Sequence, residues 1–123
     1  MAATVEAHIL DDTGEIPNSS LPLLVYKRAI EPPEKAGPHA FEALFRANGW
    51  GGSWRDGVYS FHHYHSTAHE VLGIYSGTAT LQLGGEPGLV LRVSPGDAVL
   101  IPAGVGHKNL GSSGNFGVVG WER

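Results

Sequence analysis

"HHYHSTAHE" (residues 62–70) places four of the chain's seven histidines and one carboxylate within nine residues. The run 58–65 alternates with a period of two, which predicts a strand whose successive side chains point to opposite faces. His63 and His65 share one face of that strand, whereas His62 points to the other. Glu70 begins the next predicted strand after a short hairpin, so it can face the two histidines across the gap between the strands.

Short strand-like runs continue towards the C-terminus and are separated by turn residues, mostly glycines, of which the chain has 18. They cover residues 58–65, 70–76, 78–83, 88–93, 97–102 and 115–121. Six short strands at near-regular intervals predict an all-β antiparallel sandwich or barrel. The positions in phase with its interior are Tyr59, Phe61, Leu72, Ile74, Leu81 and Leu83.

The first half of the chain gives a weaker pattern. Residues 1–36 are predicted to be irregular, except for one strand at 21–30. A short helix is predicted from Pro38 to a C-terminal cap at Asn48, and 49–57 is predicted to be a loop. The expected organisation is a single structural domain, in which residues 1–56 form an arm, a short helix and a loop that pack on a barrel of residues 57–121.

Composition excludes several classes of function. The formal net charge is −4 and no basic stripe is present, so we expect no nucleic-acid partner. The chain has no cysteine, which excludes disulfides and thiolate metal sites and fits a reducing compartment. Its first residues carry acids and lack the apolar run of an export signal or a membrane span. These features predict a cytoplasmic protein without a membrane partner.

Two residue spacings resemble the two sequence motifs of the cupin superfamily. The first spacing is carried by Gly57, His63, His65, Glu70 and Gly77, and the second by Gly96, Pro102, Gly104 and His107. The second motif usually ends in an asparagine, where this chain has Gly111 and places Asn109 two residues earlier. The wording "YHSTAHEVLGIYSGTATLQLGG" is similar in particular to the bacterial YjlB-like cupins, a functionally uncharacterised subgroup.

This resemblance implies a double-stranded β-helix, or jelly roll, that holds a metal ion through His63, His65, Glu70 and His107. Three imidazole nitrogens and one carboxylate oxygen suit a divalent first-row ion such as Mn, Fe, Co, Ni or Zn. Four protein ligands leave an octahedral ion two positions for water or substrate. The alternative is a metal-free cupin whose histidines form hydrogen bonds in the core.

Two residues beside these ligands are candidates for catalysis. Tyr59 shares a strand face with His63 and could donate to a bound ligand, although a buried tyrosine usually pairs with the backbone. His69 could line the pocket or support a metal ligand, or it could point away from the ion. His62 is expected to pack on the outer side of its strand.

The leading functional hypothesis is a metal-dependent enzyme that acts on a small polar or carboxylated molecule as a dioxygenase, decarboxylase or isomerase. The alternatives are a ligand-binding or metal-sensing module without turnover and a domain that the ion merely stabilises. The resemblance also implies a homodimer. Residues 21–30 have no obvious partner within the barrel, so we expect that strand to lie at the dimer interface, unless it packs on its own barrel.

Overall fold

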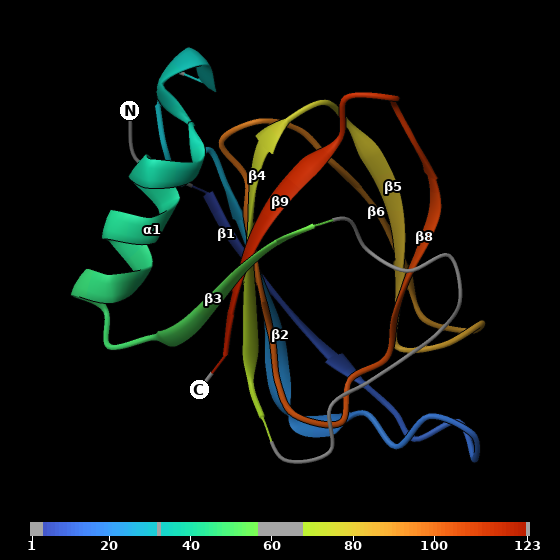
Figure 1. Ribbon diagram of the computed structural model, residues 1–123. Helices are drawn as coiled ribbons and strands as arrows, with labels where there is room; N and C mark the ends of the chain where they lie inside the picture. Colours follow the sequence, from blue (N-terminus) through green and yellow to red (C-terminus); the bar gives the residue numbers. More distant parts are fainter. Residues whose placement is uncertain (1–3, 32, 57–67, 123) are drawn as a thin grey trace.

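The computed structural model describes residues 4–31, 33–56 and 68–122, with residues 51–56 described by their backbone alone. The chain runs through nine strands, one α-helix and one short 3₁₀ helix in these ranges (Figure 1). The elements are β1 (Thr4–Leu10), β2 (Ser19–Lys27), η1 (Pro33–Lys35), α1 (Pro38–Ala47), β3 (Gly51–Asp56), β4 (Glu70–Ser76), β5 (Ala79–Leu83), β6 (Leu89–Val93), β7 (Ala98–Ile101), β8 (His107–Ser112) and β9 (Gly117–Glu122).

The strands form two antiparallel sheets that face one another (Figure 1). One sheet has six strands in the order β1-β2-β7-β4-β9-β3, and the other has three in the order β6-β5-β8. Apart from the consecutive pair β1 and β2, neighbours in the large sheet are distant in sequence, as in the pairing of β2 with β7 and of β4 with β9. This arrangement confirms the all-β jelly roll with one short helix.

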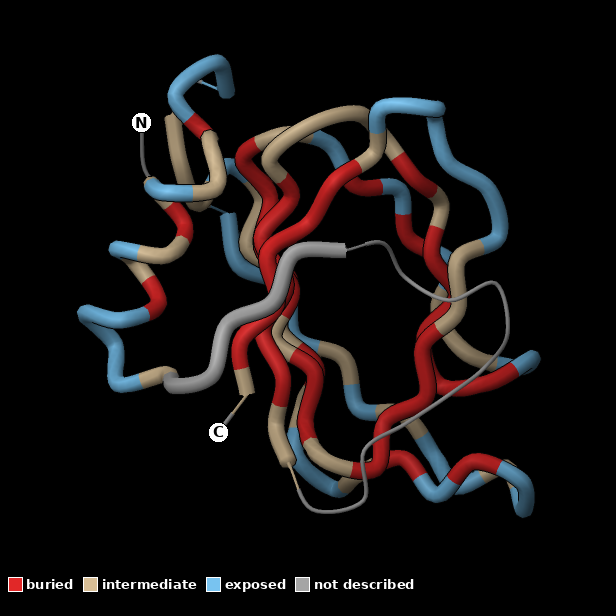
Figure 2. The backbone as a smooth tube through the Cα atoms, in the orientation of Figure 1, coloured by how far each residue is buried: buried red, intermediate tan, exposed pale blue. Residues whose placement is uncertain are grey.

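Apolar side chains from both sheets fill the space between them. Leu72 and Ile74 of β4 and Leu81 and Leu83 of β5 have no exposed surface, as their alternation predicted. The interior cluster consists of Leu23, Val25, Leu72, Ile74, Ala79, Leu81, Leu83, Leu91, Val93, Val99, Ile101, Val105 and Val118. Buried residues are concentrated along the strands of the two sheets (Figure 2).

Helix α1 covers part of the outer face of the six-stranded sheet, where it contacts β3, β4 and β9. Pro38 occupies its first turn and Asn48 is its C-cap, as the sequence predicted. Phe41 and Phe45, one turn apart, are the buried residues of the helix. Phe41 lies on Gly73 of β4, where an added Cβ would come 2.4 Å from the ring. The helix therefore depends on a position without a side chain in the sheet beneath it.

Two expectations for the first half of the chain are wrong. Residues 4–10 form β1, although 1–36 was expected to be irregular outside 21–30, and Gly51–Asp56 forms β3 in place of a loop. The pattern of β1 is hard to recognise because most of its side chains, apolar ones included, stay exposed. The sequence of β3, "GGSWRD", has low strand propensity, and its antiparallel pairing with β9 holds it at the sheet edge. The short strand β8 was also missed.

The expectation that 21–30 lacks a partner within the barrel is wrong as well. This segment supplies most of β2, which pairs with β1 on one side and with β7 on the other. Leu23 and Val25 are fully buried in the interior cluster, so the strand packs on its own barrel. A dimer contact through this strand therefore loses its motivation. Among the described helices, none is long and apolar enough to cross a membrane.

Candidate functional site

The described residues include half of the predicted metal ligands. Glu70 and His107 are described, together with the candidate His69. His63 and His65 lie within 57–67, outside the described residues, and so do His62 and Tyr59. The structure therefore describes the predicted carboxylate ligand and one of the three predicted imidazole ligands.

Glu70 is the first residue of β4, in the middle of the six-stranded sheet. It pairs with Ile101 of β7 and is 2% exposed. Leu72 and Ile74 follow at two-residue intervals and belong to the cluster between the sheets. The period of a strand therefore directs the Glu70 carboxylate into the same interior, at the end of the sheet where β4 begins.

His107 is the first residue of β8 in the three-stranded sheet, where it pairs with Leu83 and is 2% exposed. The turn before it is closed by a hydrogen bond of 3.1 Å from the Val105 N–H to the Pro102 carbonyl. Gly104 in that turn has a φ of +92°, and an added Cβ would lie 2.5 Å from a backbone oxygen. Glycine is thus required there both by the backbone angle and by the close approach.

The two side chains meet across the space between the sheets. His107 Nε2 lies 3.2 Å from Glu70 Oε1, and both side chains are 3% exposed. His107 Nδ1 lies 3.3 Å from the Val105 carbonyl oxygen, which favours the ring form that carries a proton on Nδ1. In the neutral form of that ring the Nε2 lone pair faces the Glu70 carboxylate, so two acceptor atoms are close together. A cation bound by both atoms would satisfy them.

The separation of the two atoms also fits shared ligation. Bonds of ~2.1 Å that meet at a right angle place two donor atoms about 3 Å apart on one divalent ion. The observed 3.2 Å is close to this spacing. Within the described ranges no three histidine, aspartate or glutamate side chains gather closely enough to hold an ion by themselves. Glu70 and His107 therefore supply a compatible pair that needs further ligands.

His69, a weak catalytic candidate from the sequence, holds the backbone of the turn that leads to His107. Its Nδ1 accepts a hydrogen bond of 2.8 Å from the Ala103 N–H, and the residue is half-buried. Because Nδ1 accepts, a neutral ring carries its proton on Nε2. His69 directly precedes Glu70, so this hydrogen bond links the start of β4 to the turn before His107. The contact positions the backbone of that turn.

Asn18 also positions this turn, although no motif or spacing in the sequence indicates that role. Asn18 is 7% exposed, and its Nδ2 donates to the carbonyls of Asp11 at 2.6 Å and Gly84 at 3.0 Å. Its Oδ1 accepts from the Gly106 N–H at 3.2 Å, and its own N–H donates to the Gly104 carbonyl at 2.8 Å. One buried amide therefore joins the β1–β2 connection, the β5–β6 hairpin and the residue before His107.

A second carboxylate shares the face of Glu70. Glu122 of β9 pairs directly with Glu70 of β4, and directly opposed residues of antiparallel strands project on the same face of a sheet. Glu122 is half-buried. Only the long-range register of β4 and β9 brings the two residues together, so sequence spacing could not have identified Glu122.

Comparisons with known proteins agree with this fold. A family model described as "Cupin domain" matches residues 55–114. The uncharacterized protein YjlB of Bacillus subtilis (strain 168) is 42% identical over 121 residues, which cover 98% of this chain and 70% of that protein. The structure of RmlC from Streptococcus suis in complex with dTDP-D-xylose superposes with a TM-score of 0.51 at 15% identity. The superposition covers 100% of this chain and 71% of RmlC, and it supports the shared fold. The chain belongs to the cupin family, as a relative of YjlB.

Proposed function

We propose that this chain is a small metal-dependent cupin enzyme that acts on a small polar or carboxylated molecule. Its ion would be held by His63, His65, Glu70 and His107. The observation that carries the proposal is the buried contact of 3.2 Å between His107 Nε2 and Glu70 Oε1, which joins the two sheets. A buried carboxylate and imidazole at this separation are suited to a divalent first-row ion.

The contacts around this pair support a binding role. The Val105 carbonyl can orient the His107 ring through Nδ1, which is the usual way a protein fixes the tautomer of a metal-ligating histidine. A bound divalent ion would supply Lewis acidity for polarising a substrate oxygen or activating water. Glu122, on the same sheet face as Glu70, adds a second carboxylate that can accept a hydrogen bond from a substrate hydroxyl or amine.

The location proposed is the cytoplasm. A chain without cysteine has no need of an oxidising compartment. Fractionation of cells that express the natural protein, with detection by an antibody, tests this part of the proposal.

Metal analysis of protein purified without chelator tests the site. We expect about one divalent ion per chain in the wild type, much less in His107→Ala, and an unchanged content in His62→Ala, the matched histidine variant, because the sequence alternation predicts that His62 points away from the site. Chelator should lower the melting temperature of the wild type and of His62→Ala more than that of His107→Ala, because a ligand that binds only the folded state stabilises it. Equal metal content in all three proteins would contradict the ligand assignment.

Turnover requires a separate experiment. Metal-loaded protein is incubated with a library of small carboxylated and polar metabolites, and substrate loss and product formation are followed by mass spectrometry. A compound that is converted by the wild type and not by His107→Ala supports the enzyme. A compound that binds saturably and is recovered unchanged favours instead a ligand-binding module built on the same site.

A further inference from the structure

A cavity of about 410 Å³ lies on the outer face of the six-stranded sheet, beside helix α1. Its floor comes from three neighbouring strands. Tyr26 of β2 pairs there with Ala98 of β7. Leu100 of β7 pairs with Val71 of β4. Each of these four residues has a chain neighbour in the cluster between the sheets, so their own side chains point to the opposite face. The cavity therefore lies across the sheet from the predicted metal site.

Three aromatic side chains meet at this cavity from separate parts of the chain. Tyr26 comes from β2, Phe45 from the buried side of α1, and Trp50 from the residues after the helix. The Trp50 N–H donates a hydrogen bond of 3.1 Å to the Phe45 carbonyl, which holds the backbone that carries the indole. Aromatic side chains favour flat ring systems as ligands, because stacked and edge-to-face contacts add to the burial of apolar surface.

The lining also restricts the charge of a ligand. No aspartate, glutamate, lysine, arginine or histidine is among the described residues that line the cavity. A charged ligand would therefore lose its hydration without gaining an opposite charge. Polar contacts come from the Tyr26 hydroxyl and the Asn48 side chain. Asn48 Nδ2 donates to the Leu44 carbonyl at 2.8 Å, so the amide oxygen is the group that can accept from a ligand.

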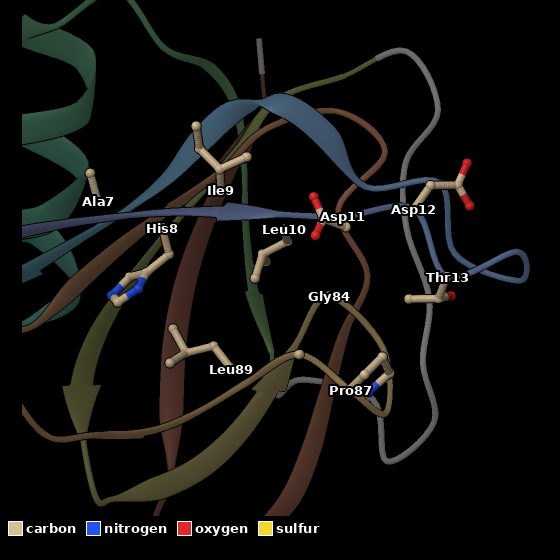
Figure 3. A pocket seen from close by; sticks show the side chains of 11 residues that line it. Ala7, His8, Ile9, Leu10, Asp11, Asp12, Thr13, Gly84, Pro87 and Leu89 are labelled. Carbon is tan, nitrogen blue, oxygen red and sulfur yellow. The ribbon is translucent and has the colours of Figure 1, made fainter.

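A second cleft in the described part of the chain has a different character (Figure 3). It lies between β1 and the β5–β6 hairpin and has a volume of about 540 Å³. His8, Asp11 and Asp12 line it together with the apolar Leu10 and Leu89 (Figure 3). Because charged groups line this cleft, it serves as a comparison for the uncharged cavity beside α1.

We propose that the cavity beside α1 binds one uncharged, flat aromatic molecule with a hydrogen-bond donor, such as a phenol, an indole or an arylamine. The occupant is a small molecule, because sheet and helix bound the space and its volume falls within the range of about 300–1,000 Å³ that is usual for such sites. The aromatic side chains contact the ring system, and the Asn48 oxygen accepts the donor. This site does not depend on the ion, which would lie on the other face of β4.

Two dyes with the same ring system test the proposal. N-phenyl-1-naphthylamine is uncharged, whereas 1-anilinonaphthalene-8-sulfonate carries a sulfonate. In fluorescence titrations of the full chain, the uncharged dye should bind saturably, one per chain, and roughly tenfold or more tightly than the sulfonate, because the cavity offers no cation to a buried anion. Chelator should leave this binding unchanged.

Variants locate the dye. Leu44→Glu puts a carboxylate into the cavity and should weaken binding of the uncharged dye roughly tenfold or more. Ala43→Glu is the matched control and should leave the affinity unchanged, because Ala43 is exposed on the same helix and does not line the cavity. Ala29→Leu should weaken binding without adding charge, since the larger side chain fills part of the space. Circular dichroism first shows that each variant is folded.

Several results would overturn the proposal. They include no saturable binding of the uncharged dye, equal affinity for the two dyes, or an equal loss in Leu44→Glu and Ala43→Glu. Binding that is lost in Leu89→Glu in place of Leu44→Glu would put the dye in the cleft of Figure 3, and release by chelator would put it inside the barrel. An affinity that falls as protein concentration rises would show that a second copy covers this face.

Discussion

Substitution of Asn18 should destabilise the turn before His107 without removing any of the predicted metal ligands. Asn18→Ala removes the donor to the Asp11 and Gly84 carbonyls and the acceptor for the Gly106 N–H. The bonds to Gly84 and Gly106 are buried. Asn18 also has a φ of +55°, a backbone angle that asparagine tolerates and alanine does not.

The magnitude follows from these contacts. Each buried partner left without a hydrogen bond costs roughly 1–1.5 kcal/mol, and the left-handed backbone adds about 1 kcal/mol for alanine. We therefore expect a loss of about 3 kcal/mol for Asn18→Ala and about 2 kcal/mol for Asn18→Gly, which keeps the backbone relaxed. For a domain of this length 1 kcal/mol corresponds to about 4 °C in melting temperature, so the alanine variant should melt about 12 °C lower.

Thermal unfolding followed by circular dichroism, with urea titration for the free energy, measures these differences. Asn109→Ala is the matched control, because the hydrogen bonds of its amide are exposed, and it should cost less than ~0.5 kcal/mol. Asn18→Ala should also lower metal affinity, since Gly106 directly precedes His107. If Asn18→Ala were no less stable than Asn109→Ala, the buried amide would not be the anchor of the turn.

Three further predictions concern packing, charge and pH. Gly73→Ala should undock α1, because the added Cβ would lie 2.4 Å from the Phe41 ring. Gly111→Ala is the control, because its Cβ would enter open space. Limited proteolysis should therefore cut the helix faster in Gly73→Ala than in Gly111→Ala. Asp97→Ala should destabilise by about 2–3 kcal/mol in urea titration, because the buried carboxylate accepts from the Ser94 N–H at 2.9 Å and a second backbone N–H at 3.1 Å. Metal content after dialysis should fall in mildly acidic buffer, since imidazoles bind metal only when neutral; an unchanged content would argue against histidine ligands.

Most of the second half of the fold, apart from β8, could be predicted because its signals are local. Strand β4 spans Glu70–Ser76, as the alternation predicted, and Gly77, Gly84 and Gly96 have the positive φ of tight turns. Strands β1 and β3 carry no such signal. Most of the side chains of β1 stay exposed, and β3 is set by its pairing with β9.

The candidate site divides in the same way. Motif spacing identified Glu70 and His107 as residues that could share a site, and the structure brings them to 3.2 Å. The contacts that place them are long-range: Asn18 bonds to Gly106, 88 residues away, and Glu122 meets Glu70 through the register of β4 and β9. Sequence spacing cannot reveal these contacts, because they form only when the chain is folded.

The backbone from Ala103 to His107 is held at three places. His69 accepts from the Ala103 N–H, the backbone N–H of Asn18 reaches the Gly104 carbonyl, and the Asn18 side chain holds the Gly106 N–H. A ligand whose backbone is fixed in this way loses little freedom when it binds an ion, which favours affinity. Asn18 and β2 lie outside the residues 55–114 that match the family model. The segment that carries the motif therefore needs the first part of the chain to hold His107 against Glu70.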